Sequence, residues 1–178
     1  LDLDQLAEAA SAAAAASAPS SSSSSSSSKN PLEGVDAVFV ALGTTRASAG
    51  SAEAFWKVDV GGVASAAALA AAAGAPFLSL VSASGASRNG WRPTSSLLHP
   101  LYYAAAKGAA EQEAIEYREK SGVSSSVAIY RPGLLDRGAD RQRGGERWAI
   151  RCGLPSLPVG DLAAVMVADA VAALHGEG

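Results

Sequence analysis

Three short apolar runs, separated by longer helix-forming segments, constrain the fold of this chain more than any other feature. In chain order they cover Val35–Leu42, Ala75–Ser82 and Ser125–Tyr130. The first run is rich in β-branched residues and does not alternate apolar with polar positions, which is typical of a buried strand in a parallel sheet. Buried strands that alternate with helices predict an α/β fold with right-handed crossovers.

The segments between and after these runs are expected to be helices and loops. Helices are predicted over Ser51–Ala73, with an interruption near Gly61–Gly62, over Leu101–Ser121 and over Leu162–Leu174. Gly74 and Gly122 follow the first two helices, a common position for the left-handed residue that ends a helix. A long polar loop is expected over 83–100, and a basic loop is expected between Gly133 and the last helix.

The amino-terminal region differs from the rest of the chain. Residues 1–18 are rich in Ala and predict a helical segment of the same fold. Residues 19–30 contain nine consecutive Ser, have no apolar face and are expected to form a disordered linker or insertion. The α/β domain is then expected over 31–178, and a length of 178 residues corresponds to one domain.

Composition and charge exclude several classes of protein. The net charge is −3 at pH 7, so the chain lacks the basic surplus of a nucleic-acid-binding protein. Cys152 is the only cysteine, which excludes an internal disulfide framework and a Cys-cluster metal site. The apolar stretch Ala64–Ala73 is too short to span a bilayer, and no signal peptide is predicted. A cytoplasmic protein without a transmembrane segment is therefore expected.

Small or polar residues follow each of the three predicted strands. These segments are 43–46, 82–84 and 131–133. Ligands of parallel α/β sheets bind at the carboxyl ends of the strands. The three segments are therefore expected to lie together at one ligand-binding edge of the sheet.

Tyr103 and Lys107 are the candidate catalytic pair. They lie four residues apart at the start of a predicted helix and therefore share one face of it. An ammonium beside a phenol favours the phenolate, which makes such a phenol a usable proton donor near neutral pH. Ser82, at the end of the preceding strand, or Ser84, two residues later, is expected to orient a substrate oxygen toward the same phenol.

These segments, in this order, resemble the atypical short-chain dehydrogenase/reductases over about residues 34–174. The matching stretches are Val38–Arg46, Phe55–Asp59, Leu80–Ala86, Tyr103–Lys107 and Tyr130–Leu135. The LGTTR and RPGLL stretches are similar to the Tat-interacting oxidoreductase group (Tat-interactive protein 2-like), whereas YxxxK is shared by the whole superfamily. The resemblance implies a Rossmann-type doubly wound parallel sheet, so that 31–178 would be an NAD(P)-binding domain.

The resemblance also implies an NADP(H)-binding oxidoreductase that transfers a hydride to or from a carbonyl or alcohol carbon. Tyr103 would be the acid/base, Lys107 its helper and a ribose contact, and Ser82 the catalytic serine. The cofactor would contact Leu42, Gly43, Thr44, Lys107, Arg131, Pro132, Gly133, Leu135 and Arg143. NADPH is expected to be preferred over NADH, with a small carbonyl compound as substrate.

Two departures from the family pattern modify these expectations. No glycine-rich turn of the GxGxxG or GxxGxxG type precedes the first apolar run, so the fold is expected to be N-terminally truncated. The interval from Ser82 to Tyr103 is longer than in the family, and the extra loop 88–100 is expected to reshape or cover the pocket.

Two alternative functions remain open at this point. A non-catalytic regulatory protein could keep the fold, use the nucleotide as a structural or redox-sensing ligand and bind a protein partner, by analogy with relatives. A sugar-nucleotide epimerase or dehydratase shares the same constellation of residues. The arginine-rich segment from Arg137 to Arg151 fits either a 2′-phosphate or partner contact, or a solvated loop.

Overall fold

The computed structural model describes Gln5, Glu8 and the ranges 30–87, 100–121, 125–138 and 144–176. Its main sheet contains three parallel strands in the order β1–β2–β3. Their bounds are Ala37–Val40, Phe77–Val81 and Ser126–Tyr130. Two shorter parallel strands, β4 (Leu134–Asp136) and β5 (Ser156–Pro158), form a separate pair. All described strand pairs are parallel, as the apolar runs predict.

Helices fill the segments between the strands. They are α2 (Arg46–Ala49), α3 (Ala52–Trp56), the π-helical turn η1 (Lys57–Gly61), α4 (Gly62–Ala72), α5 (Pro100–Ser121), α6 (Gly144–Arg151) and α7 (Val159–His175). Gly74 has a φ of 67° just after α4, in the left-handed region that its predicted role as helix terminator requires. Of the predicted N-terminal helix, Gln5 and Glu8 are described and both are helical.

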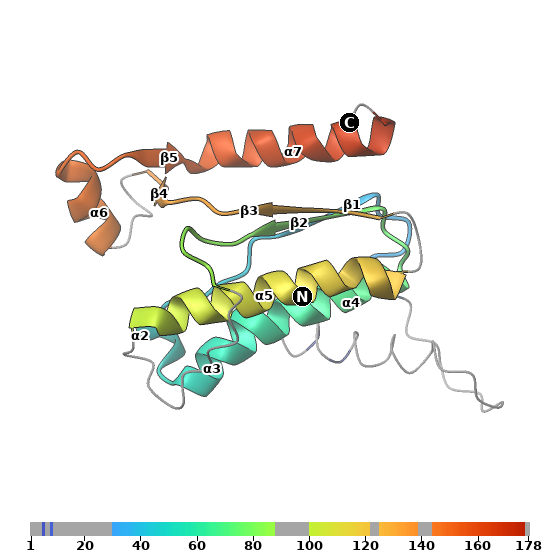
Figure 1. The fold of residues 1–178 in the computed structure, drawn as a ribbon, viewed down its shortest axis with the longest axis horizontal. Coiled ribbons are helices and arrows are strands. Elements are labelled where there is room, and N and C mark those ends of the chain that lie inside the picture. Colours follow the sequence, from blue (N-terminus) through green and yellow to red (C-terminus); the bar gives the residue numbers. More distant parts are fainter. Residues whose placement is uncertain are drawn as a thin grey trace.

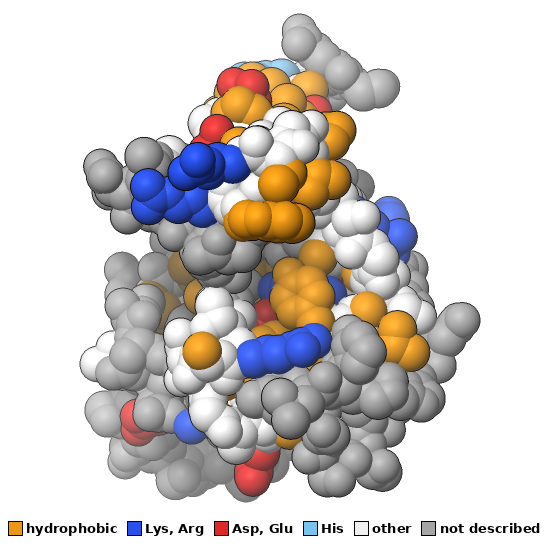
Figure 2. Space-filling view, turned by 90° about the vertical axis from the view of Figure 1, so that its left-hand side faces the viewer, with side chains coloured by type: hydrophobic (Ala, Val, Ile, Leu, Met, Phe, Trp, Pro, Cys, Tyr) orange, Lys and Arg blue, Asp and Glu red, His pale blue; other side chains and the backbone are white. Residues whose placement is uncertain are grey.

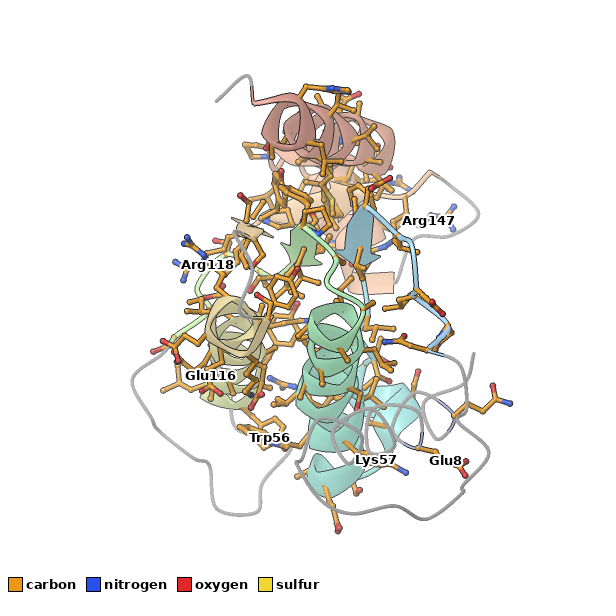
Figure 3. The ribbon with its side chains drawn as sticks, turned by 90° about the vertical axis from the view of Figure 1, so that its right-hand side faces the viewer. Glu8, Trp56, Lys57, Glu116, Arg118 and Arg147 are labelled. Carbon is orange, nitrogen blue, oxygen red and sulfur yellow. The ribbon has the colours of Figure 1, made fainter. Side chains whose placement is uncertain are left out.

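The elements form three layers, with the sheet in the middle (Figure 1). The helices α4 and α5 lie side by side on one face of the sheet, and α7 covers the other face (Figure 3). The main core cluster joins strand residues to alanines of α4 and α5, because small side chains let two helices and a sheet approach closely. This α/β arrangement with helices on both faces confirms the predicted fold class.

The predicted interruption near Gly61–Gly62 is a π-helical turn and does not break the helix. The N–H of Gly62 donates to the carbonyl of Lys57, five residues earlier. A π turn adds one residue to the helix, and such turns occur frequently at functional sites. Here both Asp59 and Val60 are buried, so the turn places a carboxylate inside the protein.

The prediction of a basic loop after the third strand is wrong for much of that segment. Residues 134–136 and 156–158 form the short strands β4 and β5, and 144–151 form α6. Strands of three residues give almost no periodic signal, and the arginines of α6 resemble a solvated loop when read alone. Tertiary pairing between β4 and β5 decides the structure of this region.

The first predicted strand is less buried than its sequence suggests. Within the described residues, β1 pairs with β2 along one edge, and Phe39 is 44% exposed. The expectation of burial on both faces holds better for β2, in which Phe77 to Leu80 are all buried. The difference follows from position, because β2 lies between two strands, whereas β1 has one neighbouring strand among the described residues.

One helical run is long and apolar enough to cross a membrane by length and composition alone. It covers Ala52–Ala72 and has a mean hydropathy of 1.2. The run is longer than the apolar stretch Ala64–Ala73, because α3, η1 and α4 are continuous. Half of the run is buried inside the protein, where Val63 and Ala70 belong to the core cluster of the sheet.

Several predicted segments lie outside the described residues. They are most of the N-terminal helix, the Ser-rich segment up to Lys29, the larger part of the loop 88–100, Gly122 and Arg143. The predicted division into 1–18, 19–30 and 31–178 stays a prediction.

Three tyrosine hydroxyls connect different elements of the fold. Tyr102, Tyr117 and Tyr130 donate hydrogen bonds to the carbonyl of Ala52, the carbonyl of Ala75 and the carboxylate of Asp169, respectively. Burial raises the pKa of each of these phenols. The Asp169 carboxylate raises the pKa of Tyr130 further, because it favours the neutral hydroxyl.

Alkaline pH is expected to destabilise the protein through these tyrosines. Because their folded-state pKa values lie above the ordinary value of 10.0, the folded state binds more protons than the unfolded state above about pH 10. Their contribution to the free energy of unfolding is therefore complete below that pH and decreases above it. Urea unfolding between pH 8 and pH 11 measures the loss, and Tyr130→Phe should reduce it. An unchanged free energy of unfolding up to pH 11 contradicts the prediction.

Candidate functional site

A cavity of about 160 Å³ lies at the carboxyl ends of the three main strands. Its walls come from the ends of β1, β2 and β3, from the start of α5, and from β4 and α6. The lining residues are Ala41, Leu42, Gly43, Val81, Ser82, Ala83, Tyr103, Lys107, Pro132, Gly133, Leu134, Leu135, Arg137 and Glu146. The predicted ligand-binding edge therefore coincides with a real cavity, here called the strand-end pocket.

The strand-end pocket brings together most of the residues predicted for the site. Among its walls are Leu42, Gly43, Ser82, Tyr103, Lys107, Pro132, Gly133 and Leu135. Thr44 and Arg131 do not line it, although both lie next to residues that do. Arg143 lies outside the described residues.

Figure 2 shows the end of the molecule that carries β4, β5, α6 and the start of α5. Hydrophobic side chains and blue Lys and Arg side chains gather around a hollow between the upper and lower parts of this face. Arg137 and Glu146 form an ion pair of 2.7 Å and line the pocket from the side of β4 and α6. Sequence reasoning did not assign this pair, because α6 was expected to be part of a loop.

Lys107 is held by a buried partner that sequence reasoning left without a role. Its Nζ lies 2.8 Å from Oδ1 of Asp59, with 7% and 0% of the two side chains exposed. The same Nζ donates to the carbonyl of Leu42 at 3.3 Å. The sequence carries one signal for this pair: Lys107 is an isolated charge among small helical residues, and a buried charge requires a partner.

The Asp59 carboxylate also fixes the backbone at the end of β1. Its Oδ2 accepts a hydrogen bond of 2.8 Å from the N–H of Thr44. A Cβ at Gly43 would lie 3.2 Å from Nζ of Lys107 and 3.3 Å from Oδ1 of Asp59, so this position favours glycine. The backbone from Leu42 to Thr44 is thus held by the Lys107–Asp59 pair.

Tyr103 and Lys107 do lie on one face of α5, as their spacing predicts. The Lys107 Nζ is 6.0 Å from the centre of the Tyr103 ring. Tyr103 is 37% exposed, and its ring makes an edge contact with Phe55 at 6.3 Å between centroids. Because Asp59 compensates the ammonium charge, activation of the phenol by Lys107 stays a prediction.

Ser82 belongs to a second buried polar cluster. Its Oγ donates to Oε1 of Glu111 at 2.6 Å, and Ser82 is 5% exposed while Glu111 is fully buried. Arg131 donates to the same carboxylate through Nε at 2.7 Å and Nη2 at 2.5 Å. The Glu111 carboxylate raises the pKa of Arg131 through this hydrogen bond. The Arg131 side chain therefore contacts Glu111 and does not line the pocket.

Other candidate residues have ordinary surroundings in the described part of the chain. Ser84 is exposed, and its N–H donates to the carbonyl of Pro132. Cys152 is exposed. Across the described ranges, no group of three His, Cys, Asp or Glu side chains is placed to hold a metal ion.

Comparisons with known proteins give one family match and one similar solved structure. A family model described as "NAD dependent epimerase/dehydratase family" matches residues 18–135. A solved structure described as "MoeE5 in complex with UDP-glucose and NAD" is similar with a TM-score of 0.47 and 18% sequence identity. The similarity covers 60% of this chain and 37% of that chain, so the match spans little more than a third of the solved protein. No curated protein matches significantly.

The family match is extensive and includes the strand ends that build the pocket. Residues 18–135 make up more than half of the 178-residue chain and contain β1, β2, α5 and β3. The glycine at the end of β1 and the Tyr103–Lys107 pair fall within the matched range. This chain belongs to the NAD-dependent epimerase/dehydratase family.

Proposed function

We propose that this chain is an NADP(H)-binding oxidoreductase domain of short-chain dehydrogenase/reductase type. One observation carries the proposal: the strand-end pocket joins Tyr103, Lys107 and Ser82 to the backbone segments that follow β1 and β3. A proton-transfer group beside small, backbone-lined walls is the arrangement that hydride transfer to a carbonyl requires.

The pocket fits the reacting end of a nicotinamide cofactor. A cavity of about 150 Å³ holds a single aromatic ring, and the strand-end pocket measures about 160 Å³. Gly43 lines the pocket without a side chain, because a Cβ there would meet Nζ of Lys107 and Oδ1 of Asp59. Leu42, Gly43, Pro132, Gly133 and Leu135 would hold the cofactor here, and the nicotinamide supplies or accepts the hydride when it is bound.

Tyr103 moves the proton in this proposal. In the reducing direction the carbonyl π bond breaks, its carbon gains the hydride, and its oxygen takes the proton from the Tyr103 hydroxyl. Solvent then reprotonates the phenolate, which is accessible because Tyr103 is 37% exposed. Lys107, whose Nζ lies 6.0 Å from the centre of the Tyr103 ring, would contact the ribose, and Ser82 would lie beside the reacting oxygen. In the oxidising direction each step is reversed.

The cofactor preference, the substrate class and the subgroup are proposed from the family resemblance of the sequence. The LGTTR and RPGLL stretches support membership of the Tat-interacting oxidoreductase group, with NADPH preferred over NADH and a small carbonyl compound as substrate. A cytoplasmic location and a protein partner belong to the same proposal. The Thr44 N–H donates to Asp59, and the Arg131 side chain donates to Glu111. Thr44 and Arg131 would therefore contribute to cofactor binding by positioning the adjacent pocket residues Gly43 and Pro132.

A titration of the folded chain with NADPH and with NADH, followed by nucleotide fluorescence, tests the proposal. We expect micromolar affinity for NADPH and weaker binding of NADH. Gly133→Val should weaken NADPH binding, because Gly133 lines the pocket and a Cβ there would meet no protein atom within 4 Å. Gly61→Ala is the matched control, since Gly61 also has free space around its Cα but lies in η1.

Each outcome of this titration decides the proposal. Binding that Gly133→Val weakens and Gly61→Ala preserves supports a nucleotide in the strand-end pocket. Absence of binding by a folded chain contradicts the proposal, and equal affinity for NADH contradicts the NADPH preference alone.

A non-catalytic, nucleotide-sensing protein is the second candidate. The observation that favours it is that Lys107 and Ser82 both contact buried carboxylates, Asp59 and Glu111. A sugar-nucleotide epimerase or dehydratase is supported by the family match. Retention of the nucleotide through repeated turnovers would distinguish the epimerase from a dehydrogenase that releases its cofactor.

A further inference from the structure

Glu111 sits at the centre of a polar cluster directly behind the strand-end pocket. It follows Lys107 by four residues on α5, and its side chain is fully buried. It accepts two hydrogen bonds from Arg131, at 2.7 and 2.5 Å, and one from Ser82 at 2.6 Å. A buried carboxylate with a bidentate guanidinium partner is a charged pair with short, strong hydrogen bonds.

This geometry decides the direction of the Ser82 hydrogen bond. A serine hydroxyl has one hydrogen to donate and two lone pairs that accept. An ionised carboxylate only accepts, so the single hydrogen of Ser82 Oγ points to Glu111. The Ser82 Oγ can therefore form any further hydrogen bond only as an acceptor. Ser82 also lines the strand-end pocket, so a ligand that reaches this oxygen meets an acceptor.

We propose that Glu111, paired with Arg131, makes Ser82 a hydrogen-bond acceptor toward the pocket, so that Ser82 favours a ligand hydroxyl over a carbonyl oxygen. Glu111 is then a positioning residue that acts through Ser82. The inference deepens the proposed function and rests on it for the identity of the pocket's ligand. It also changes the expected role of Ser82, which cannot donate to a substrate carbonyl while Glu111 holds its hydrogen. Tyr103 alone of the three catalytic candidates then donates to that oxygen.

Two small probes of similar size test this polarity on the chain loaded with NADPH. 2,2,2-Trifluoroethanol can donate a hydrogen bond, whereas dimethyl sulfoxide can only accept one. The dissociation constants of both probes are measured for the wild-type chain, for Ser82→Ala and for Ser79→Ala. Ser79→Ala is the matched control, because it removes a buried serine hydroxyl from β2, three residues before Ser82, that does not line the pocket.

Ser82→Ala is expected to weaken trifluoroethanol binding about threefold to tenfold, the usual effect of one hydrogen bond, and to leave dimethyl sulfoxide unchanged. Ser79→Ala should change neither constant. Weaker binding of dimethyl sulfoxide in Ser82→Ala overturns the proposal, because Ser82 would then be a donor. Unchanged binding of both probes overturns it as well.

A second measurement needs neither probe nor nucleotide, so it separates this inference from the proposed function. The chain is labelled with ¹³C in its glutamate carboxyl groups and studied by NMR near pH 7. The Glu111 signal should have the shift of an ionised carboxylate, and a slowly exchanging Ser82 hydroxyl proton should be visible and vanish in Ser82→Ala. A protonated Glu111, or a freely exchanging Ser82 hydroxyl, overturns the proposal even where NADPH binds. Where NADPH or both probes fail to bind, this measurement alone decides the polarity.

Discussion

Replacing Tyr103 by Phe is expected to lower kcat by about 10²–10⁴-fold, the usual contribution of a positioned acid/base. The ring keeps its edge contact with Phe55 and its place beside Lys107, so the pocket retains its shape. NADPH affinity should therefore stay at the wild-type value. Turnover with a panel of small carbonyl compounds and NADPH measures the first effect, and fluorescence titration measures the second.

Tyr102→Phe is the matched control for this prediction. Tyr102 is the adjacent tyrosine, but its hydroxyl donates to the carbonyl of Ala52 and is buried away from the pocket. Its loss should cost about 0.5–1.5 kcal/mol of stability and little turnover. Full activity of Tyr103→Phe would remove Tyr103 from the mechanism. Absence of turnover in the wild-type chain, together with firm NADPH binding, would favour the nucleotide-sensing alternative.

Removing the Asp59 carboxylate is expected to be the most destabilising single change near the site. Asp59→Ala leaves the Lys107 ammonium buried without its partner and leaves the N–H of Thr44 without an acceptor. Breaking one half of a buried ion pair costs about 3–5 kcal/mol. Urea unfolding at neutral pH measures the loss. Binding of NADPH should weaken as well, since the backbone from Leu42 to Thr44 loses its support.

Two further variants separate the charge of Asp59 from its shape. Asp59→Asn keeps an oxygen for the Thr44 N–H and should be less destabilising than Asp59→Ala. The double variant Asp59→Ala with Lys107→Met should recover part of the lost stability, because no unpaired buried charge remains. An Asp59→Ala chain within about 1 kcal/mol of the wild type would show that water or another group satisfies Lys107.

Much of the architecture follows from local sequence patterns. The compact apolar runs around Phe39, Leu78 and Ile129 predict parallel strands, and the order strand–helix–strand predicts that their carboxyl ends meet at one edge. The four-residue spacing of Tyr103 and Lys107 places both on one face of α5. These features are predictable because they depend on the periodicity of side chains along a helix or strand and on the fixed hand of strand–helix–strand connections.

The elements β4, β5, α6 and η1 were not predicted from the sequence. The strands β4 and β5 are three residues long and are defined by their mutual pairing, so their own sequences carry little signal. The helix α6 was expected to be a basic loop, yet it supplies Glu146, the partner of Arg137 at the pocket. The π-helical turn η1 was expected to be an interruption, although it keeps the helix continuous and buries Asp59.

The sequence by itself determined the α/β fold, the edge of the sheet where the strand-end pocket lies, and the identity of most pocket residues. Only the tertiary structure decided what those residues can do. Lys107 is paired with Asp59, 48 positions away in the chain, and Ser82 with Glu111, 29 positions away. The physical reason is that a buried charge or hydroxyl needs a hydrogen-bonding or charged partner, and that partner determines its chemical role. Tertiary packing decides which distant residue becomes the partner, and local sequence patterns do not contain that information.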